Sequence, residues 1–310
     1  MTDSSLSPIF STLLATPAKV NLGLKIVGRR PDGYHDILTV MEPISLADNL
    51  YCEFRPGPDS RCHLCSPQLS DLDPEENLVI RAAGAMIARA RERGCAISGS
   101  WHFFLDKRIP AGAGLGGGSS NAAAVIVLLN RFYRLGLTRD ELVTEALNLG
   151  ADIPFFLAPG LARVEGVGER VTRLQASRRR WYVLVKPDFG VATGWAYAAL
   201  KLKKGYRRVV DYDLDQFSLP GPEVFYRLEN DFETPVMERY PLLARLKEWL
   251  AGRPGCRGAL MSGSGAVVYG VFDSFAAART EVAKTRQQWS GEGCSVFLAC
   301  NLEAPDSASG

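Results

Sequence analysis

The sequence predicts an α+β fold in two domains. The chain has 310 residues, of which 46% are hydrophobic and 23% charged, an ordinary composition for a globular protein long enough for two domains. Strand-like and helix-like segments follow one another without the regular alternation that a doubly wound parallel sheet requires. A basic stretch at 177–180 precedes the apolar segment 181–186, and we expect the domains to span 1–175 and 176–310.

The first domain is expected to begin with a half-buried strand at 16–26. Val20, Leu22 and Leu24 alternate there with polar side chains, which is the period of two that a strand requires. Thr138 and Glu141 have the spacing of a capping box at the start of a helix. The other elements expected in this domain are strands near 37–46, 50–54 and 101–105, a turn-rich segment at 56–76, and helices at 77–93, 119–134 and 139–149, the last two ending at Gly136 and Gly150.

The second domain is expected to mix strands and helices, without an internal repeat. Strands are predicted at 181–186, 266–272 and 294–299, and helices at 194–200, 222–228, 236–251 and 274–289. The tail at 304–310 is rich in small and polar residues and is expected to be disordered.

The charge and composition of the chain argue against several classes of binding partner. The net charge of +2 is too small to indicate nucleic acid or an acidic membrane surface, and no feature indicates an obligate protein partner. No apolar run is long enough for a membrane span, and the N-terminus carries an acid and no base before its short apolar stretch, which argues against a secretory signal. We therefore expect a cytoplasmic protein whose seven cysteines are reduced thiols. Cys62 and Cys65 form a C-x-x-C, but without a second ligand pair, so half-buried strand thiols are a better interpretation than zinc.

A glycine-rich run at 106–124, DKRIPAGAGLGGGSSNAAA, leads into an alanine-rich helical pattern. Glycines let the backbone approach an anion, and a helix that begins at Ser119 or Ser120 adds unpaired amides and the positive end of its dipole. The run therefore predicts a polyphosphate site.

Two common nucleotide loops do not explain this run well. A Walker loop needs lysine after its last glycine, and none occurs here. Gly112, Gly114 and Gly117 satisfy G-x-G-x-x-G, but the nearest later acid, Asp140, lies in the capping box rather than at a strand end. A dinucleotide loop and a purely structural glycine loop stay open as weaker alternatives.

Other candidate residues are ambiguous from spacing alone. A second glycine cluster at 261–265 is either a hairpin turn or a loop that faces the first one across a triphosphate. Asp152 follows a helix end, where a cap or turn residue is common. Lys19 and Asn21 lie on the same polar side of the first strand, and a lysine there is usually a surface residue.

The residues of these motifs, and their order along the chain, resemble those of the GHMP kinase superfamily. The resemblance implies an N-terminal mixed sheet with helices and a C-terminal ferredoxin-like α/β sandwich. The segments that carry it are 17–22 (PAKVNL), 31–35 (PDGYH), 110–124, 150–155 (GADIPF), 165–169 (EGVGE), 230–233 (NDFE) and 261–265 (MSGSG).

Within the superfamily, the triple glycine before Ser119 and the DGYH run are similar to one branch. That likeness implies transfer of the ATP γ-phosphoryl group to the 2-hydroxyl of cytidine diphosphate-linked methylerythritol, in the non-mevalonate route to isoprenoid precursors. A related kinase for homoserine or mevalonate, or a non-catalytic nucleotide-binding protein, are the alternatives.

The resemblance also implies roles for individual residues. Asp152 matches the catalytic acid/base, and Lys19 matches the lysine paired with it. Mg²⁺ is expected with ATP, and Ser119 or Ser120 is the hydroxyl that could contact it, although no carboxylate ligand is identifiable. The ATP loop would comprise Pro110, Ala111, Gly112, Ala113, Gly114, Leu115, Gly116, Gly117, Gly118, Ser119 and Ser120. Substrate contacts would come from Asn21, Tyr34, His35, Thr193 and Tyr197, with Tyr34 and Tyr197 stacking on cytosine and His35 hydrogen-bonding to it; Ala192 replaces the serine that is commoner in this family.

Overall fold

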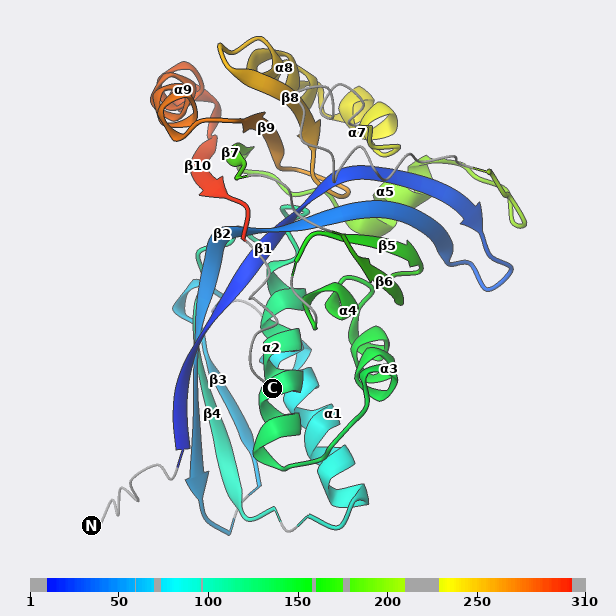
Figure 1. The fold of residues 1–310 in the computed structure, drawn as a ribbon, viewed down its shortest axis with the longest axis vertical. Helices are drawn as coiled ribbons and strands as arrows, with labels where there is room; N and C mark the ends of the chain where they lie inside the picture. Colours follow the sequence, from blue (N-terminus) through cyan, green and yellow to red (C-terminus); the bar gives the residue numbers. More distant parts are fainter. Residues whose placement is uncertain are drawn as a thin grey trace. The chain divides into compact units, whose positions relative to one another are not determined.

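The computed structural model describes residues 10–58, 60–69, 74–95, 97–157, 160–174, 179–209 and 229–302 (Figure 1). The chain divides into two compact units. Unit 1 comprises Met1–Pro17, Ala47–Ile109 and Gly116–Ala158; unit 2 comprises Ala18–Leu46, Pro110–Leu115 and Pro159–Gly310. The first two strands, β1 (Phe10–Arg29) and β2 (His35–Pro56), contribute residues to both units. A domain boundary between residues 175 and 176 stays a prediction.

Unit 1 contains a mixed sheet. The order is β3-β4-β2, where β3 (Cys62–Cys65) runs parallel to β4 (Gly99–Asp106) and β4 runs antiparallel to the C-terminal half of β2. The helices are α1 (Leu78–Glu92), α2 (Gly117–Phe132), α3 (Arg139–Leu149) and the single turn α4 (Ile153–Phe156), with short 3-10 turns at Pro67–Leu69 and Pro74–Glu76. Helices α1 and α2 pack side by side, and α1 contacts β3 (Figure 1).

An aromatic cluster forms part of the core of unit 1. The ring of Trp101, which is fully buried, packs edge-on against Phe132 with 4.8 Å between centroids. Phe54 and Phe10 contact both of these rings. The indole Nε1–H of Trp101 donates to the Tyr133 hydroxyl at 3.0 Å, so burial leaves this polar atom satisfied.

Unit 2 contains a second, four-stranded antiparallel sheet in the order β10-β7-β9-β8. These strands are β7 (Trp181–Lys186), β8 (Cys256–Met261), β9 (Val268–Phe272) and β10 (Ser295–Cys300). Counted along the chain, their order is 4-1-3-2, which confirms the predicted ferredoxin-like sandwich. In the same unit, β5 (Ala162–Gly166) pairs with the N-terminal half of β2 and with β6 (Arg170–Arg173).

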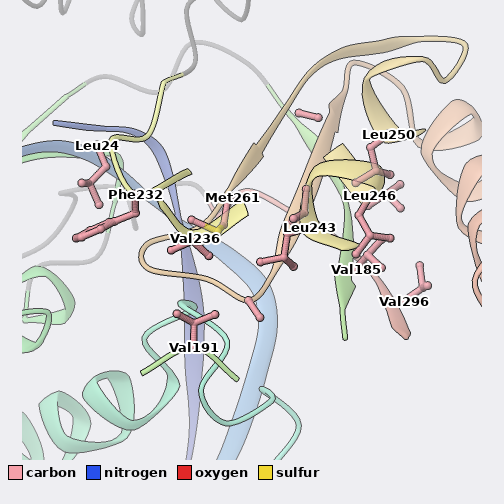
Figure 2. Close-up of a cluster of buried hydrophobic side chains, with 14 of the residues drawn as sticks. Leu24, Val185, Val191, Phe232, Val236, Leu243, Leu246, Leu250, Met261 and Val296 are labelled. Carbon is pink, nitrogen blue, oxygen red and sulfur yellow. The ribbon is translucent and has the colours of Figure 1, made fainter. Parts of the chain in front are cut away.

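In the described part of unit 2, the helices are α5 (Thr193–Ala199), α7 (Glu233–Arg239), α8 (Pro241–Ala251) and α9 (Phe275–Gln288), with a 3-10 turn at Ser290–Glu292. A hydrophobic cluster joins helices to the antiparallel sheet (Figure 2). Leu243, Leu246 and Leu250 extend from α8 toward Val185 and Val296 of that sheet, and all three leucines are fully buried. These contacts explain the apolar spacing of the α8 sequence.

Several expected elements are corrected. The helix predicted at 236–251 is two helices, because Pro241 cannot continue the first helix and Tyr240 leaves the helical conformation. The strands expected at 37–46 and 50–54 are one continuous strand, and β5, β6 and β8 were not predicted. The helix predicted at 222–228 and the tail at 304–310 lie outside the described residues.

The seven cysteines are free thiols. Cys62 is partly buried and Cys65 is exposed on the same strand. They are three positions apart and therefore lie on opposite faces, so they cannot chelate one ion together.

Within the described ranges, no group of three or more His, Cys, Asp or Glu side chains could hold a metal ion. No helix in that part of the chain combines the length and apolarity needed to cross a bilayer.

Candidate active site

The glycine-rich run has the backbone geometry expected for binding an anion. Gly112, Gly114 and Gly116 have φ values of 59°, 72° and 68°, and the intervening Ala113 and Leu115 keep negative φ. Glycines in the left-handed region let a loop turn its backbone N–H groups toward an anion. The run therefore has the local conformation of a phosphate-binding loop.

Helix α2 begins at Gly117, two residues earlier than predicted, with Gly116 at its N-cap position. The first intrahelical bond runs from the Ser120 N–H to the Gly116 carbonyl at 2.9 Å. The amides of Gly117, Gly118 and Ser119 precede this bond, so they have no carbonyl partner within the helix. They add three donors at the positive end of the helix dipole.

The second glycine cluster contacts the first directly, in unit 2. The Ser262 hydroxyl donates to the Gly114 carbonyl at 2.9 Å, and the Val267 N–H donates to the Ala113 carbonyl at 3.2 Å. A Cβ at Gly114 would lie 2.1 Å from the Ser262 carbonyl oxygen, so a side chain there would collide. The cluster thus supports the glycine-rich run, and the expectation that it faces that run across a triphosphate stays a prediction.

A buried asparagine holds the second cluster in place. Asn230 Nδ2 donates to the carbonyls of Met261 and Gly263 at 2.8 and 2.7 Å, and Glu233 Oε1 accepts from the Met261 N–H at 2.9 Å. The sequence identifies the NDFE run only as part of the family resemblance, and its contacts with the second cluster appear in the folded chain.

Lys19 is buried in unit 2 and contacts the glycine-rich run. Its Nζ donates to Asn21 Oδ1 at 2.7 Å and to the Gly114 carbonyl at 3.0 Å. Asn21 in turn donates from Nδ2 to the Thr39 hydroxyl at 2.9 Å. The prediction that Lys19 and Asn21 share one side of the strand is confirmed, and both are core residues rather than surface residues. Since the Asn21 amide has protein partners at both atoms, a substrate contact from it stays a prediction.

Asp152 lies in unit 1, at the N-cap position of α4, and is partly exposed. Its side chain makes no capping hydrogen bond to α4, so the interpretation as a helix cap does not explain it. Pro154 fixes the first turn of α4 directly after it, and this turn is buried.

An aromatic cluster in unit 2 joins two of the predicted substrate residues, and a third lies next to one of them in the sequence. The rings of His35 and Tyr197 stack with 4.7 Å between centroids, and Phe232 packs edge-on against Tyr197 at 4.8 Å. Tyr34 is 66% exposed at the adjacent position. Burial, and to a smaller degree the Arg29 charge, lower the pKa of His35, so the folded protein favours the neutral imidazole. Exposed and stacked aromatic rings of this kind can accept a nucleobase.

Thr193 lies at the start of α5, where its hydroxyl is 3.1 Å from the Ser264 hydroxyl. This contact links α5, which carries Tyr197, to the second glycine cluster. Thr193 is exposed, so its hydroxyl can also reach a ligand.

Two protein-family models match the chain. The model described as the GHMP kinases N-terminal domain matches residues 77–160, and the one described as the GHMP kinases C-terminal domain matches residues 216–291. Together they cover more than half of the sequence. This chain belongs to the GHMP kinase family.

Relatives of this GHMP kinase are known by sequence. A protein of Syntrophotalea carbinolica named 4-diphosphocytidyl-2-C-methyl-D-erythritol kinase is 40% identical over 276 residues, which are 88% of this chain and 94% of that protein. A protein of Geobacter sp. with the same name is 40% identical over 277 residues, or 88% of this chain and 95% of the relative.

Solved structures agree with the family. A crystal structure of 4-(cytidine 5'-diphospho)-2C-methyl-D-erythritol kinase superposes on this GHMP kinase with a TM-score of 0.71, at 33% identity, over 94% of this chain and 99% of that one. A homoserine kinase from Cytophaga hutchinsonii has the same TM-score of 0.71 at 17% identity, over 99% of both chains, which shows a shared fold.

Proposed function

We propose that this GHMP kinase transfers the γ-phosphoryl group of ATP to the 2-hydroxyl of 4-diphosphocytidyl-2-C-methyl-D-erythritol, in the non-mevalonate route to isoprenoid precursors. The observation that carries the proposal is the 40% identity, over 88% of the chain, to a protein named for that substrate. The stacked His35 and Tyr197 rings, with Tyr34 beside them, support a substrate that contains a nucleobase.

ATP fits the residues of the glycine-rich run. The left-handed glycines and the first amides of α2 present N–H donors, and a triphosphate is the ligand that needs most of them. Phosphoryl transfer passes through a loose transition state with charge on the equatorial oxygens, so fixed dipoles aimed at those oxygens stabilise it. Residues Pro110 to Ser120 thus bind and orient the nucleotide in this proposal.

A magnesium ion would neutralise the β- and γ-phosphate oxygens when it is bound with ATP. Ser119 is partly exposed and Ser120 is only 3% exposed, so Ser119 is the hydroxyl that fits a contact to the ion. No cluster of metal-binding side chains accompanies it among the described residues, which fits an ion held mainly by phosphates and water.

Asp152 accepts the proton of the substrate hydroxyl in this mechanism. The hydroxyl oxygen forms the new O–P bond while the bond from the γ-phosphorus to the bridging oxygen breaks, and ADP leaves. Lys19 would keep Asp152 ionised and oriented. The two residues belong to different units, so their pairing stays a prediction.

Cytosine would lie between Tyr34 and Tyr197, with His35 at its polar edge. Because the His35 ring now stacks on Tyr197, the base would replace that ring on the tyrosine face. A buried polar edge without a partner is costly, so the site should reject a uridine analogue more strongly than size alone predicts.

The test is an assay of ADP release with the purified protein. ATP and the cytidylyl methylerythritol substrate should give turnover, whereas homoserine and mevalonate should give none, and free CMP should compete with the substrate. Turnover of homoserine or mevalonate without competition by CMP would contradict the proposed substrate.

Replacement of Asp152 by Asn tests the proposed base. Asn keeps the size of the side chain but cannot accept the proton, so kcat should fall by at least about a hundredfold. The dissociation constant for ADP should change less than about twofold, because Asp152 acts on the acceptor hydroxyl. An Asn variant with nearly normal turnover would remove Asp152 from this role.

A further inference from the structure

Asp48 is a fully buried carboxylate in the C-terminal half of β2, in unit 1. The proposed reaction does not use it. A buried carboxylate is costly unless it is paired and hydrogen-bonded, so its contacts indicate what it does.

The Asp48 carboxylate binds the chain on both sides of the glycine-rich run. On the N-terminal side, Oδ1 accepts from the backbone N–H groups of Arg108 and Ile109, both at 2.8 Å, and Oδ2 accepts from Lys107 Nζ. On the C-terminal side, Oδ2 accepts from Asn121 Nδ2 at 3.1 Å, in the first turns of α2. One side chain therefore joins the residue before Pro110 to the residue after Ser120.

Two further contacts hold the chain segments before Pro110 and after Ser120 in place. Asn121 Nδ2 also donates to the Thr16 hydroxyl at 2.7 Å, and that hydroxyl donates to the Asp48 carbonyl at 3.3 Å. A Cβ at Gly117 would lie 2.9 Å from Ile109 Cγ2, so the residue before Pro110 packs directly against the first residue of α2.

We propose that Asp48 is a positioning residue for the nucleotide, because its carboxylate closes the base of the loop that holds the phosphates. The inference rests on the proposed role of residues 110–120 in binding ATP. A loop whose ends are already fixed loses less conformational freedom when a ligand orders it, so closure should raise nucleotide affinity. Asp48 contacts none of the acceptor residues, so affinity for the cytidylyl substrate should not depend on it.

Asp48→Asn is the sharpest variant. Asn keeps one oxygen for the amides of Arg108 and Ile109 but replaces the second oxygen with a donor, which cannot accept from Asn121 or Lys107. The dissociation constant for ADP, measured by titration calorimetry, should rise about tenfold. The KM for ATP should rise with it, while the dissociation constant for CMP stays within about twofold.

Asn121→Ala tests the same closure without removing a charge. The ADP dissociation constant should rise about threefold to tenfold, and the loss in the double variant should be smaller than the sum of the two single losses, because the two side chains share one hydrogen bond. If Asp48→Asn does not fold, Asn121→Ala still decides the question.

Glu42→Gln is the matched control. Glu42 is also fully buried and bound by an arginine, Arg180 at 2.6 Å, but it belongs to unit 2 and touches no residue of the loop ends. This variant should lower the melting temperature and leave the ADP dissociation constant unchanged. Normal ADP affinity in both Asp48→Asn and Asn121→Ala, or equal losses in the Glu42→Gln control, would overturn the proposal. A wild-type protein that binds ADP but does not phosphorylate the cytidylyl substrate would contradict the proposed function instead.

Discussion

At the scale of single residues, three glycines with positive φ differ in what a side chain would meet. Gly114 has φ 72° and a neighbouring carbonyl oxygen 2.1 Å from its missing Cβ. Gly112 has φ 59° and only the Gly190 Cα at 3.7 Å, and Gly94 has φ 75° with nothing within 4 Å. The left-handed conformation alone costs a non-glycine residue about 1–2 kcal/mol. Only at Gly114 does a collision with the backbone add to that cost.

Gly114→Ala should therefore disrupt nucleotide binding more than Gly112→Ala does. We expect an ADP dissociation constant raised more than about tenfold and a free energy of unfolding lowered by about 2–4 kcal/mol, because the second glycine cluster must move. Gly94→Ala is the control for backbone strain and should cost about 1 kcal/mol with normal ADP affinity. Calorimetry and urea unfolding measure the two quantities, and equal effects at positions 94 and 114 would contradict this account.

His35 should make base binding sensitive to acid. Its pKa is lowered from 6.5, first by burial and then by Arg29, so the folded protein favours the neutral ring. A group with a lowered folded pKa of this kind stabilises the native state above 6.5 and loses that contribution as pH falls through 6.5 toward the folded value. Affinity for CMP should likewise stay constant from pH 8 to 6.5 and fall in more acidic solution. A His35→Gln variant should bind CMP more weakly, and its affinity should not fall further in acid. If the affinity of this variant still falls below pH 6.5, another group causes the pH dependence.

At the scale of elements, local patterns predicted the secondary structure where local forces decide it. The capping box of Thr138 and Glu141 is present, and the helix it starts has the predicted bounds, 139–149. The alternation of Val20, Leu22 and Leu24 predicted a strand, which in the structure extends over Phe10–Arg29. Residues 10–15 alternate between partly buried and exposed positions, although their sequence FSTLLA does not alternate in polarity, so the sequence pattern did not indicate the start of this strand.

Elements that depend on distant partners were missed. Strand β8 contains arginine and glycine in its first half, so its sequence lacks a strand pattern, and pairing with β9 determines it. Strands β5 and β6 are short, and each depends on a neighbouring strand in the same way, because β5 pairs with β2 and β6 pairs with β5. The break at Pro241 was readable from sequence, because a proline is favoured in the first turn of a helix and not in its interior.

In the candidate site, too, features decided by local sequence could be predicted and features decided by distant partners could not. The glycine-rich run could be predicted because backbone positions with positive φ favour glycine, and glycines are visible in the sequence. The supports of that run could not, since the Asn230 contacts join residues about thirty positions apart. A single buried Asn or Asp carries no signal of which loop it will hold.

At the scale of the whole chain, β1 and β2 are the strands that contribute residues to both units. They are 20 and 22 residues long, and each contributes to both units. Unfolding of either unit removes partners from strands that also belong to the other. We therefore expect one cooperative transition, although each unit has its own hydrophobic core.

Leu246→Ala tests this expectation. Leu246 is fully buried in the cluster of unit 2, and its truncation should cost about 2–5 kcal/mol. Hydrogen-exchange mass spectrometry can follow β9 in unit 2 and β4 in unit 1 separately. If the units unfold together, protection should fall by the same free energy in both strands. Val209→Ala, at a side chain that is 98% exposed, should change neither. A loss confined to β9 would mean that the units open independently, and that β1 and β2 do not transmit stability from one to the other.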